Sequence, residues 1–329
     1  MLTRNGSFCR SWSVEFDFGF LRMLPSGFPR MRHKLEYAPV WLILKVMSLL
    51  PLEFARALGI SVGYLVYMLH RRLRRVGLRN LVMGMPEKTP RDRKKILRAV
   101  FRTLGRQLAD FCQLPNYDLK NIETLAVYEN FEAFDAARAR GKGVLFLTAH
   151  LGGWEIGSFM HSLHGNAMAV VVRPLDNSYL DRIVTHYRTM HGNRVFSKDD
   201  FARGLLSAMK KGETVGVLMD QNMTPPQGVF VDFFGTEACT ASGIARVALK
   251  TDAAVVPAFT IWDPVLRKYR VHFEPAVPLV RTKAHEADVL ANTANFTKII
   301  EDFVRRYPEQ WLWVHKRWKT RPEGQAPLY

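Results

Sequence analysis

The chain has 329 residues, 48% of them hydrophobic, which suits one large domain or two smaller ones with a substantial core. Its 47 Lys and Arg outnumber its 30 Asp and Glu, giving a formal net charge of +17. This charge favours an anionic partner: nucleic acid, an acidic membrane surface or a phosphorylated substrate. The three cysteines (Cys9, Cys112, Cys239) have no metal-binding or disulfide spacing and indicate reduced thiols facing the cytosol.

The N-terminal part divides into two stretches. Residues 1–33 lack helical or strand periodicity and the apolar core of a signal peptide, so we expect a poorly ordered tail. Residues 34–80 are expected to form a membrane-anchoring helical segment. Within it, the run 40–50 lies between Pro39 and Pro51 and is too short to cross a bilayer, because a helix of that length spans only about 16 Å.

The longer apolar run 52–69 carries charges and glycines on one side, and arginines follow it between residues 71 and 79. This pattern favours a helix pair that lies in, or dips into, a bilayer. The alternatives are a kinked spanning helix over 40–69 and a helix buried in a bundle. In either membrane arrangement, the arginines on the exit side favour a cytoplasmic main domain.

Residues 81–329 are expected to form one α/β domain with a largely parallel sheet, because strand and helix patterns alternate. An amphipathic helix is predicted between Pro90 and Pro115. Further helices are predicted at 131–140, 179–190, 200–211, 241–250 and 286–306, and strands at 144–147, 167–172, 194–197, 214–219, 255–262 and 269–273.

One of these strands leads to a candidate catalytic side chain. The apolar run 144–147 precedes His150, two glycines follow, and Glu155 lies in the first turn of the next predicted helix. On one continuous helix this spacing leaves the two side chains about 140° apart, so the break at Gly152 and Gly153 is needed to bring them together. A paired His can act as a general base on a hydroxyl, with the carboxylate fixing its tautomer. Alone, a His at a strand end is more often structural.

Polar side chains follow three predicted strands: His150 with Glu155, Arg173 with Asn177, and Asp220 with Gln221. Ligands of open α/β sheets bind outside the carboxyl ends of the strands, so we expect these clusters to form one site. His150 and Glu155 are its candidate catalytic residues, and the other four are candidate substrate-binding residues. Taken singly, Arg173 reads as a surface guanidinium and Asp220 as a cap or turn residue.

Several other chemistries lack their motifs. The remaining histidines have no ligand spacing, and the sequence has no HExxH and no Cys/His cluster, so we expect no metal. The dinucleotide fingerprint and the GxSxG nucleophile elbow are also missing. A His base that activates the hydroxyl of its own substrate needs neither these parts nor a cofactor.

The C-terminal run 309–322 alternates Trp with Lys and Arg. Such a strip can stack nucleic-acid bases, or it can lie at the headgroup layer of a membrane. Because the arginines at 71–79 adjoin an apolar segment, we favour lipid and expect no nucleic-acid partner.

These motifs together resemble the bacterial lipid A acyltransferases of the lauroyl and myristoyl type, in the lysophospholipid acyltransferase-like superfamily. The resemblance runs from about residue 35 to 322 and rests on residues 148–155, 173–177, 219–222, 231–235 and 310–322, the last being the most specific. The glycerolipid acyltransferases share the His-x4-acid pair but normally carry an EGTR-like motif, which this chain lacks. Residues 1–33 match nothing in the family pattern.

The resemblance implies transfer of an acyl chain from acyl carrier protein to a hydroxyl of a lipid A precursor, at the cytoplasmic face of the bacterial inner membrane. His150 would take the hydroxyl proton, and Glu155 would hold and polarise His150. Arg173 would pair with a phosphate or the developing charge, and Asp220 would orient Arg173 or the acceptor. The expected partners are acyl carrier protein, the acidic glycolipid and inner-membrane phospholipid.

Two alternatives stay open. The same fold can acylate another glycolipid or an aminolipid, because the sequence does not fix the acceptor. A protein of a different class, a non-catalytic binder of membranes or nucleic acid, could use the same basic stretches.

Overall fold

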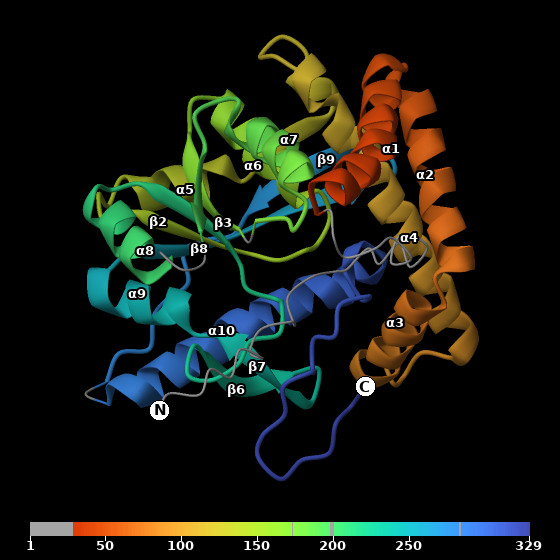
Figure 1. Cartoon of the computed structure of the whole chain (residues 1–329). Coiled ribbons are helices and arrows are strands. Elements are labelled where there is room, and N and C mark those ends of the chain that lie inside the picture. The colour runs from red at the N-terminus through yellow and green to blue at the C-terminus, as the bar shows by residue number, and fades with distance from the viewer. Residues whose placement is uncertain (1–28, 173, 198–200, 283) are drawn as a thin grey trace, which may run out of the picture.

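The computed structural model describes residues 29–172, 174–197, 201–282 and 284–329, and its centre is a seven-stranded sheet (Figure 1). Its strand order is β1-β9-β8-β2-β5-β3-β4. The strands are β1 (Ala126–Glu129), β2 (Val144–Thr148), β3 (Met168–Val172), β4 (Arg194–Ser197), β5 (Thr214–Leu218), β8 (Ala254–Asp263) and β9 (Lys268–Phe273). The pairs along β8-β2-β5-β3-β4 are parallel and β8 pairs with β9 antiparallel, so the prediction of a largely parallel sheet is confirmed.

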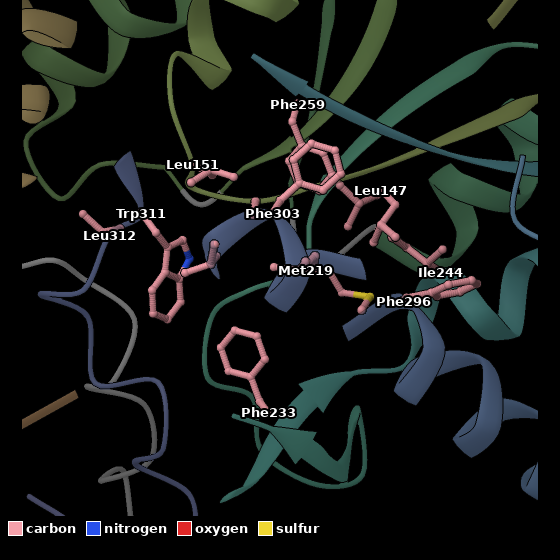
Figure 2. Close-up of a cluster of buried hydrophobic side chains, with 14 of the residues drawn as sticks. Leu147, Leu151, Met219, Phe233, Ile244, Phe259, Phe296, Phe303, Trp311 and Leu312 are labelled. Carbon is pink, nitrogen blue, oxygen red and sulfur yellow. The ribbon is translucent and has the colours of Figure 1, made fainter. Parts of the chain in front are cut away.

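Helices cover both faces of the sheet, as expected for strands that are apolar on both sides. Along β2, Val144 and Phe146 pack with helices α5 (Phe131–Arg138) and α6 (Trp154–Leu163). Leu145 and Leu147 point the other way, toward α9 (Gly243–Thr251) and α10 (His285–Arg306). Figure 2 shows Leu147 in this second cluster with Ile244 and Phe296. Two cores therefore enclose β2 and hold its carboxyl end in place.

The remaining helices of the domain are α4 (Pro90–Gln113), α7 (Ser178–Thr189) and α8 (Phe201–Lys210). The predicted helices and the six predicted strands are confirmed, with small differences at their ends. Three features are not predicted from the sequence: helix α3 (Arg71–Gly84), strand β1, and the separate hairpin of β6 (Gly228–Phe233) and β7 (Thr236–Ala241). That hairpin packs on α10, below the sheet in Figure 1.

Helix α1 (Pro29–Leu49) begins inside the stretch expected to be a tail and continues through Pro39, so the predicted helix start after that proline is wrong. Pro39 lies on the exposed side of α1, where a carbonyl that loses its helical partner can face solvent. Residues 1–28 of the expected tail lie outside the described part of the chain.

Helix α2 (Leu52–Leu69) packs one face closely on α4 through glycines. A Cβ atom built on Gly59 would lie 2.2 Å from the carbonyl oxygen of Gly105, and one on Gly63 would lie 2.1 Å from that of Phe101. Neither position tolerates a side chain, because backbone atoms occupy the space. Helix α2 is therefore a packed part of the domain on this face, as in the bundle alternative, although its opposite face is exposed.

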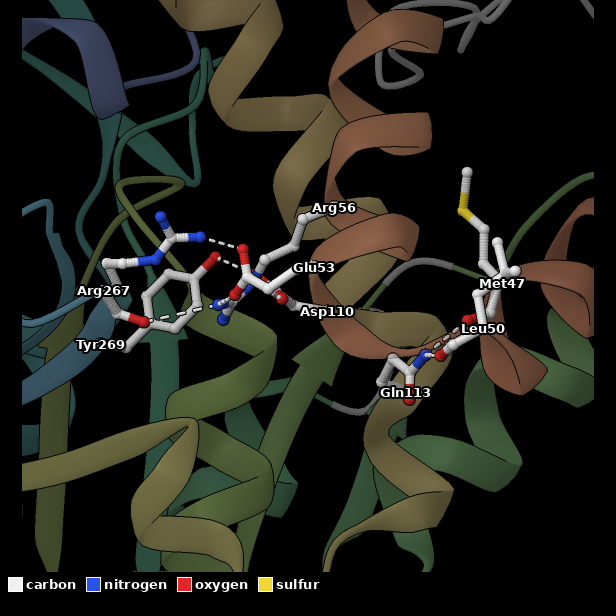
Figure 3. Close-up of polar contacts among 8 residues, drawn as sticks. All are labelled: Met47, Leu50, Glu53, Arg56, Asp110, Gln113, Arg267 and Tyr269. Carbon is white, nitrogen blue, oxygen red and sulfur yellow. Dashed lines mark hydrogen bonds and ion pairs between the residues drawn. The ribbon is translucent and has the colours of Figure 1, made fainter.

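A buried polar cluster ties the same helix to the sheet (Figure 3). Arg56 of α2 donates from Nε to Asp110 of α4 at 2.7 Å, and the Tyr269 hydroxyl of β9 donates to the same carboxylate at 2.7 Å. Glu53 pairs with Arg56 and with Arg267. Three elements that are far apart in sequence are thus joined at one carboxylate.

The C-terminal aromatic run is part of the core, so its interpretation as a surface strip is wrong. The side chains of Trp311, Trp313, Arg317 and Trp318 are at most 2% exposed. The three indole N–H groups donate to Asp220, to the Pro308 carbonyl and to the Thr236 carbonyl. Alternation of Trp with cations looks like a surface pattern, but these tryptophans have internal hydrogen-bond partners that allow burial.

Candidate functional site

The turn after β2 presents His150 at the carboxyl edge of the sheet. It is held from two sides: the amide of Leu312 donates to the His150 carbonyl, and Gly153 donates to the carbonyl of Thr260 on β8. Gly152 has φ +60°, and a Cβ there would lie 1.9 Å from the Thr260 oxygen, so only glycine fits. The C-terminal run therefore fixes the backbone that carries His150.

The acid that holds His150 is Asp220. Strands β2 and β5 are adjacent and parallel, with Thr148 opposite Leu218, so the residues two positions further on also face each other. The imidazole Nδ1 lies 2.8 Å from Asp220 Oδ1, and the backbone amide of His150 donates to Oδ2 at 3.0 Å. The indole of Trp311 donates to Oδ2 at 2.7 Å. Asp220 is bound on both oxygens.

The electrostatics favour the ionised form of Asp220. Burial alone raises the pKa of this carboxyl, but His150 and the hydrogen bonds from His150 and Trp311 hold the pKa below its ordinary value of 3.8. An ionised carboxylate can only accept a hydrogen bond, so the imidazole proton lies on Nδ1. This leaves Nε2 as the basic nitrogen. The Gln221 amide lies 3.2 Å from Nε2, and the His150 side chain is 17% exposed. The site therefore orients the imidazole through Nδ1 and leaves its side chain partly accessible.

Glu155 lies elsewhere than the sequence analysis expected. Its carboxylate accepts from Nε of Arg188 on α7 at 3.0 and 3.2 Å and also pairs with Nη2 of that residue. Burial raises the pKa of Glu155, but Arg188 reverses the shift and keeps it below 4.5. The predicted pairing of Glu155 with the imidazole is therefore replaced by the His150–Asp220 pair, although His150 is close enough to stabilise the Glu155 charge.

The other predicted substrate-binding residues have different outcomes. Asn177 is a helix cap: its side-chain oxygen accepts from the Tyr179 and Leu180 amides, and its amide donates to the His33 carbonyl. It thus joins α7 to α1 and does not lie beside the imidazole. Arg173 lies outside the described residues. Asp220 contacts His150, and the prediction that it orients Arg173 or the acceptor stays a prediction.

Sequence reasoning missed Arg188 and Trp311, and only the second carried a signal. Trp311 belongs to the C-terminal run that the sequence analysis singled out, but its contact with Asp220 crosses 91 residues. Arg188 lies in a predicted helix among other polar residues, and nothing in its spacing points to Glu155. Among the described residues, no group of three His, Cys, Asp or Glu is placed to hold a metal ion.

A narrow cavity of about 80 Å³ runs between α6 and the sheet. Near the site it is lined by Thr148, Trp154, Glu155 and Arg188. The Trp154 ring makes an edge contact with His150, with ring centroids 5.1 Å apart. Most of the remaining lining is apolar, from β3, β5, β8 and β9. Such a cavity beside a base suits a chain of hydrocarbon better than a polar ligand.

A second surface lies on helices α1 and α2. Helix α2 is the helix within the described residues that is long and apolar enough to cross a membrane. The outer side chains of the two helices are large, apolar and exposed: Leu35, Trp41, Leu42, Ile43, Val46, Leu49, Phe54, Leu58, Tyr64, Leu65, Met68 and Leu69. The next helix, α3, exposes Arg71, Arg72, Arg75 and Arg79. Figure 1 shows α1 and α2 side by side at one end of the molecule, with α3 following α2.

Comparison with known proteins places the chain among acyltransferases. A family model described as bacterial lipid A biosynthesis acyltransferase matches residues 26–320. Three similar proteins of Escherichia coli are the lipid A biosynthesis palmitoleoyltransferase (27% identical; 89% of this chain and 95% of the relative), lauroyltransferase (27%; 88% and 92%) and myristoyltransferase (26%; 93% and 94%). Their names differ in the acyl chain, so similarity at this level leaves that chain open.

Proposed function

The chain belongs to the bacterial lipid A biosynthesis acyltransferases, and we propose that it moves a fatty acyl chain from acyl carrier protein to a hydroxyl of a lipid A precursor. The observation that carries the proposal is the His150–Asp220 pair at the carboxyl edge of the sheet, with Nε2 directed away from the acid. No covalent acyl-enzyme is needed, because the base acts on the hydroxyl of the acceptor.

The transfer follows from this geometry. His150 Nε2 takes the proton of the acceptor hydroxyl while its oxygen attacks the thioester carbonyl carbon. A carbon–oxygen bond forms, the carbon–sulfur bond breaks, and the imidazolium returns the proton to the departing thiolate. Asp220 stabilises the imidazolium between these steps and keeps Nδ1 protonated.

Glu155 and Arg188 contribute as a unit. Both side chains line the cavity, and two or more hydrogen bonds join them. The pair places an ionised carboxylate and a guanidinium beside Trp154, whose ring contacts His150. A guanidinium in this position suits the negative charge that develops on the thioester oxygen, and Glu155 holds it there.

The exposed face of α1 and α2 supports binding at the cytoplasmic surface of the inner membrane. Helix α2 packs on α4 along its glycine face and through Arg56 and Asp110, which supports an arrangement in which it stays with the domain at the membrane surface. We infer that the apolar face dips into the headgroup region while the arginines of α3 contact anionic lipid. Leu65→Asp, on the exposed face, should reduce flotation with anionic vesicles, whereas Asp302→Asn on α10 should not.

The decisive experiment is an assay of purified protein with acyl carrier protein loaded with different acyl chains and with a lipid A precursor. Wild-type protein should transfer the chain, and His150→Ala should lose about 10²–10⁴-fold in rate. His186→Ala, an exposed histidine on α7, is the matched control and should retain activity. If the protein acylated only another glycolipid or an aminolipid, that lipid would replace the lipid A precursor as the proposed acceptor. Full activity of a folded His150→Ala variant would refute the mechanism.

A further inference from the structure

A second histidine, His161, lies at the far end of the cavity. On α6, the residues Trp154, Glu155, Ser158 and His161 recur at helical spacing and line one wall. Trp154 is beside His150, and His161 is seven residues further along the helix, or about 10 Å.

The cavity wall opposite α6, formed by β3 and β5, runs in the same direction, from the site edge toward the middle of the sheet. The lining residues of β3 run from Val172 at its carboxyl end back to Met168, and those of β5 from Leu218 back to Gly216. A Cβ atom on Gly216 would lie 2.4 Å from the terminal methyl of Met168, so this glycine leaves the space that Met168 partly fills. The lining therefore runs from the edge that carries His150 back toward the middle of the sheet.

His161 sits in an aromatic enclosure at that inner end. Its ring makes edge contacts with Phe134 and Phe146, with centroids 4.7 and 5.2 Å away, and it is 2% exposed. Its Nδ1 lies 3.3 Å from the Tyr128 hydroxyl. Among the described residues, Nε2 is buried without a hydrogen-bond partner. Burial lowers the pKa of this imidazole to about 3, so the ring is neutral at the pH of the cytosol.

The unpaired Nε2 of His161 is an unfavourable neighbour for the end of a hydrocarbon chain. A small cavity can hold water that satisfies such an atom, and a hydrocarbon that displaces the water leaves the nitrogen unpaired. A chain that stops short of His161 avoids this cost, whereas one more methylene incurs it and also meets the ring. Leucine at the same place would oppose a longer chain by its volume alone.

We propose that His161 is the specificity-determining residue that sets the maximum length of the transferred acyl chain. The inference rests on the proposed function, because it takes the cavity as the acyl site. His161 does not touch the reacting thioester, and its substitution changes which chain is used while leaving the catalytic pair His150–Asp220 in place.

Two variants are expected to move selectivity in opposite directions. His161→Ala removes the ring and extends the cavity toward Phe134, so longer chains should gain. His161→Phe fills the end with a larger apolar ring, so shorter chains should gain. Because one methylene in an apolar pocket changes discrimination about 10–200-fold, each variant should shift the ratio of kcat/KM for adjacent even-numbered chains by at least about tenfold. Loss of stability cannot produce shifts of opposite sign.

His164→Ala is the matched control. This residue follows the last turn of α6, three positions further along the chain. Its ring contacts Tyr128, with centroids 5.2 Å apart, but it does not line the cavity. Its selectivity should equal that of the wild type.

The experiment offers the full-length protein an equimolar mixture of acyl carrier proteins loaded with decanoyl to stearoyl chains and weighs the products by mass spectrometry. Opposite shifts in the Ala and Phe variants support the proposal; if the Ala variant does not fold, a shift to shorter chains in the Phe variant decides. Wild-type selectivity in a folded, active variant overturns it. Failure of the wild type to transfer any chain would instead refute the proposed function.

Discussion

Two buried aspartates occupy matching settings in different regions of the molecule. At the carboxyl edge of the sheet, Asp220 accepts from His150 Nδ1 at 2.8 Å and from the Trp311 indole at 2.7 Å. Between α2 and the sheet, Asp110 accepts from Arg56 Nε and from the Tyr269 hydroxyl, both at 2.7 Å. Each carboxylate thus has one basic and one aromatic donor, and each side chain is at most 2% exposed.

The difference lies in the basic partner. An imidazole gains and loses a proton near neutral pH, whereas a guanidinium stays charged. Burial raises the pKa of Asp110 against the opposing charge of Arg56, while the pKa of Asp220 is held below its ordinary value. The first arrangement is a permanent clamp and the second can take part in proton transfer. The same chemical motif therefore supports structure in one region and the proposed chemistry in the other.

The largest effect is expected at Asp220, the proposed partner of the base His150. Asp220→Asn keeps the shape of the side chain but removes the charge that selects the Nδ1 proton and stabilises the imidazolium. Acyl transfer should fall by on the order of 10³–10⁴-fold, as expected when an orienting acid is neutralised. The measurement is kcat in the acyl transfer assay, with circular dichroism as the control for folding. Retention of most of the activity would show that His150 does not depend on this acid.

Substitutions in the Arg56–Asp110 clamp should change the stability of the protein and not its rate of acyl transfer. Asp110→Ala removes the buried partner of Arg56 and leaves only the exposed Glu53 to pair with it, which should lower the free energy of unfolding by about 3–5 kcal/mol. The double variant Arg56→Met with Asp110→Leu removes both charges and should recover much of this loss. Urea unfolding measures both. If Asp110→Ala instead abolished transfer in a fully folded protein, the division between clamp and catalytic pair would be wrong.

Acid sensitivity distinguishes histidines whose pKa is lowered by burial from the carboxylate Asp220, which is stabilised by its partners. Burial lowers the pKa of His161 and of His315 from 6.5 to about 3. Below about pH 6.5 the unfolded chain takes up protons that the folded protein does not, so stability falls as the pH falls, by on the order of 2 kcal/mol per histidine at about pH 5. The pKa of Asp220 is lower in the folded protein than its ordinary value of 3.8. Its contribution to stability is therefore present above pH 3.8 and is lost only as the pH falls below that value.

Urea unfolding at neutral pH and near pH 5 tests this account. His161→Phe should reduce the stability change between the two pH values, because it removes one of the two histidines whose pKa is lowered. A slope unchanged in this variant would mean that His161 is protonated in the folded protein. The same variant serves the test of acyl chain selectivity, so one preparation addresses both.

The sequence predicted the parallel sheet and its site edge because both depend on local patterns. Apolar strands followed by polar residues placed His150, Asp220 and Gln221 at one edge, and the structure brings them together. The pairing could not be predicted in this way. Glu155 was chosen because it is near in sequence, whereas Asp220 is opposite His150 only because β5 is the neighbour of β2 in the sheet.

Other errors have the same cause. Asn177 follows a strand as the site residues do, but its side chain caps α7, and nothing local separates these two uses. The C-terminal tryptophans alternate with cations as a surface strip does, and their burial depends on partners such as Asp220 and Thr236. In each case the decisive contact joins residues that only the finished fold brings together.

The smallest effect is expected at Gln221, which follows Asp220 and reaches the opposite nitrogen of the imidazole at 3.2 Å. If this amide only occupies Nε2 until the acceptor hydroxyl arrives, Gln221→Ala should change kcat by less than about tenfold, the value of one neutral hydrogen bond. KM for the lipid acceptor should change more than kcat if the amide also binds that hydroxyl. A loss as large as that of Asp220→Asn would place Gln221 in the proton transfer itself. Asp220 would then no longer differ from Gln221 as the residue on which the base His150 depends.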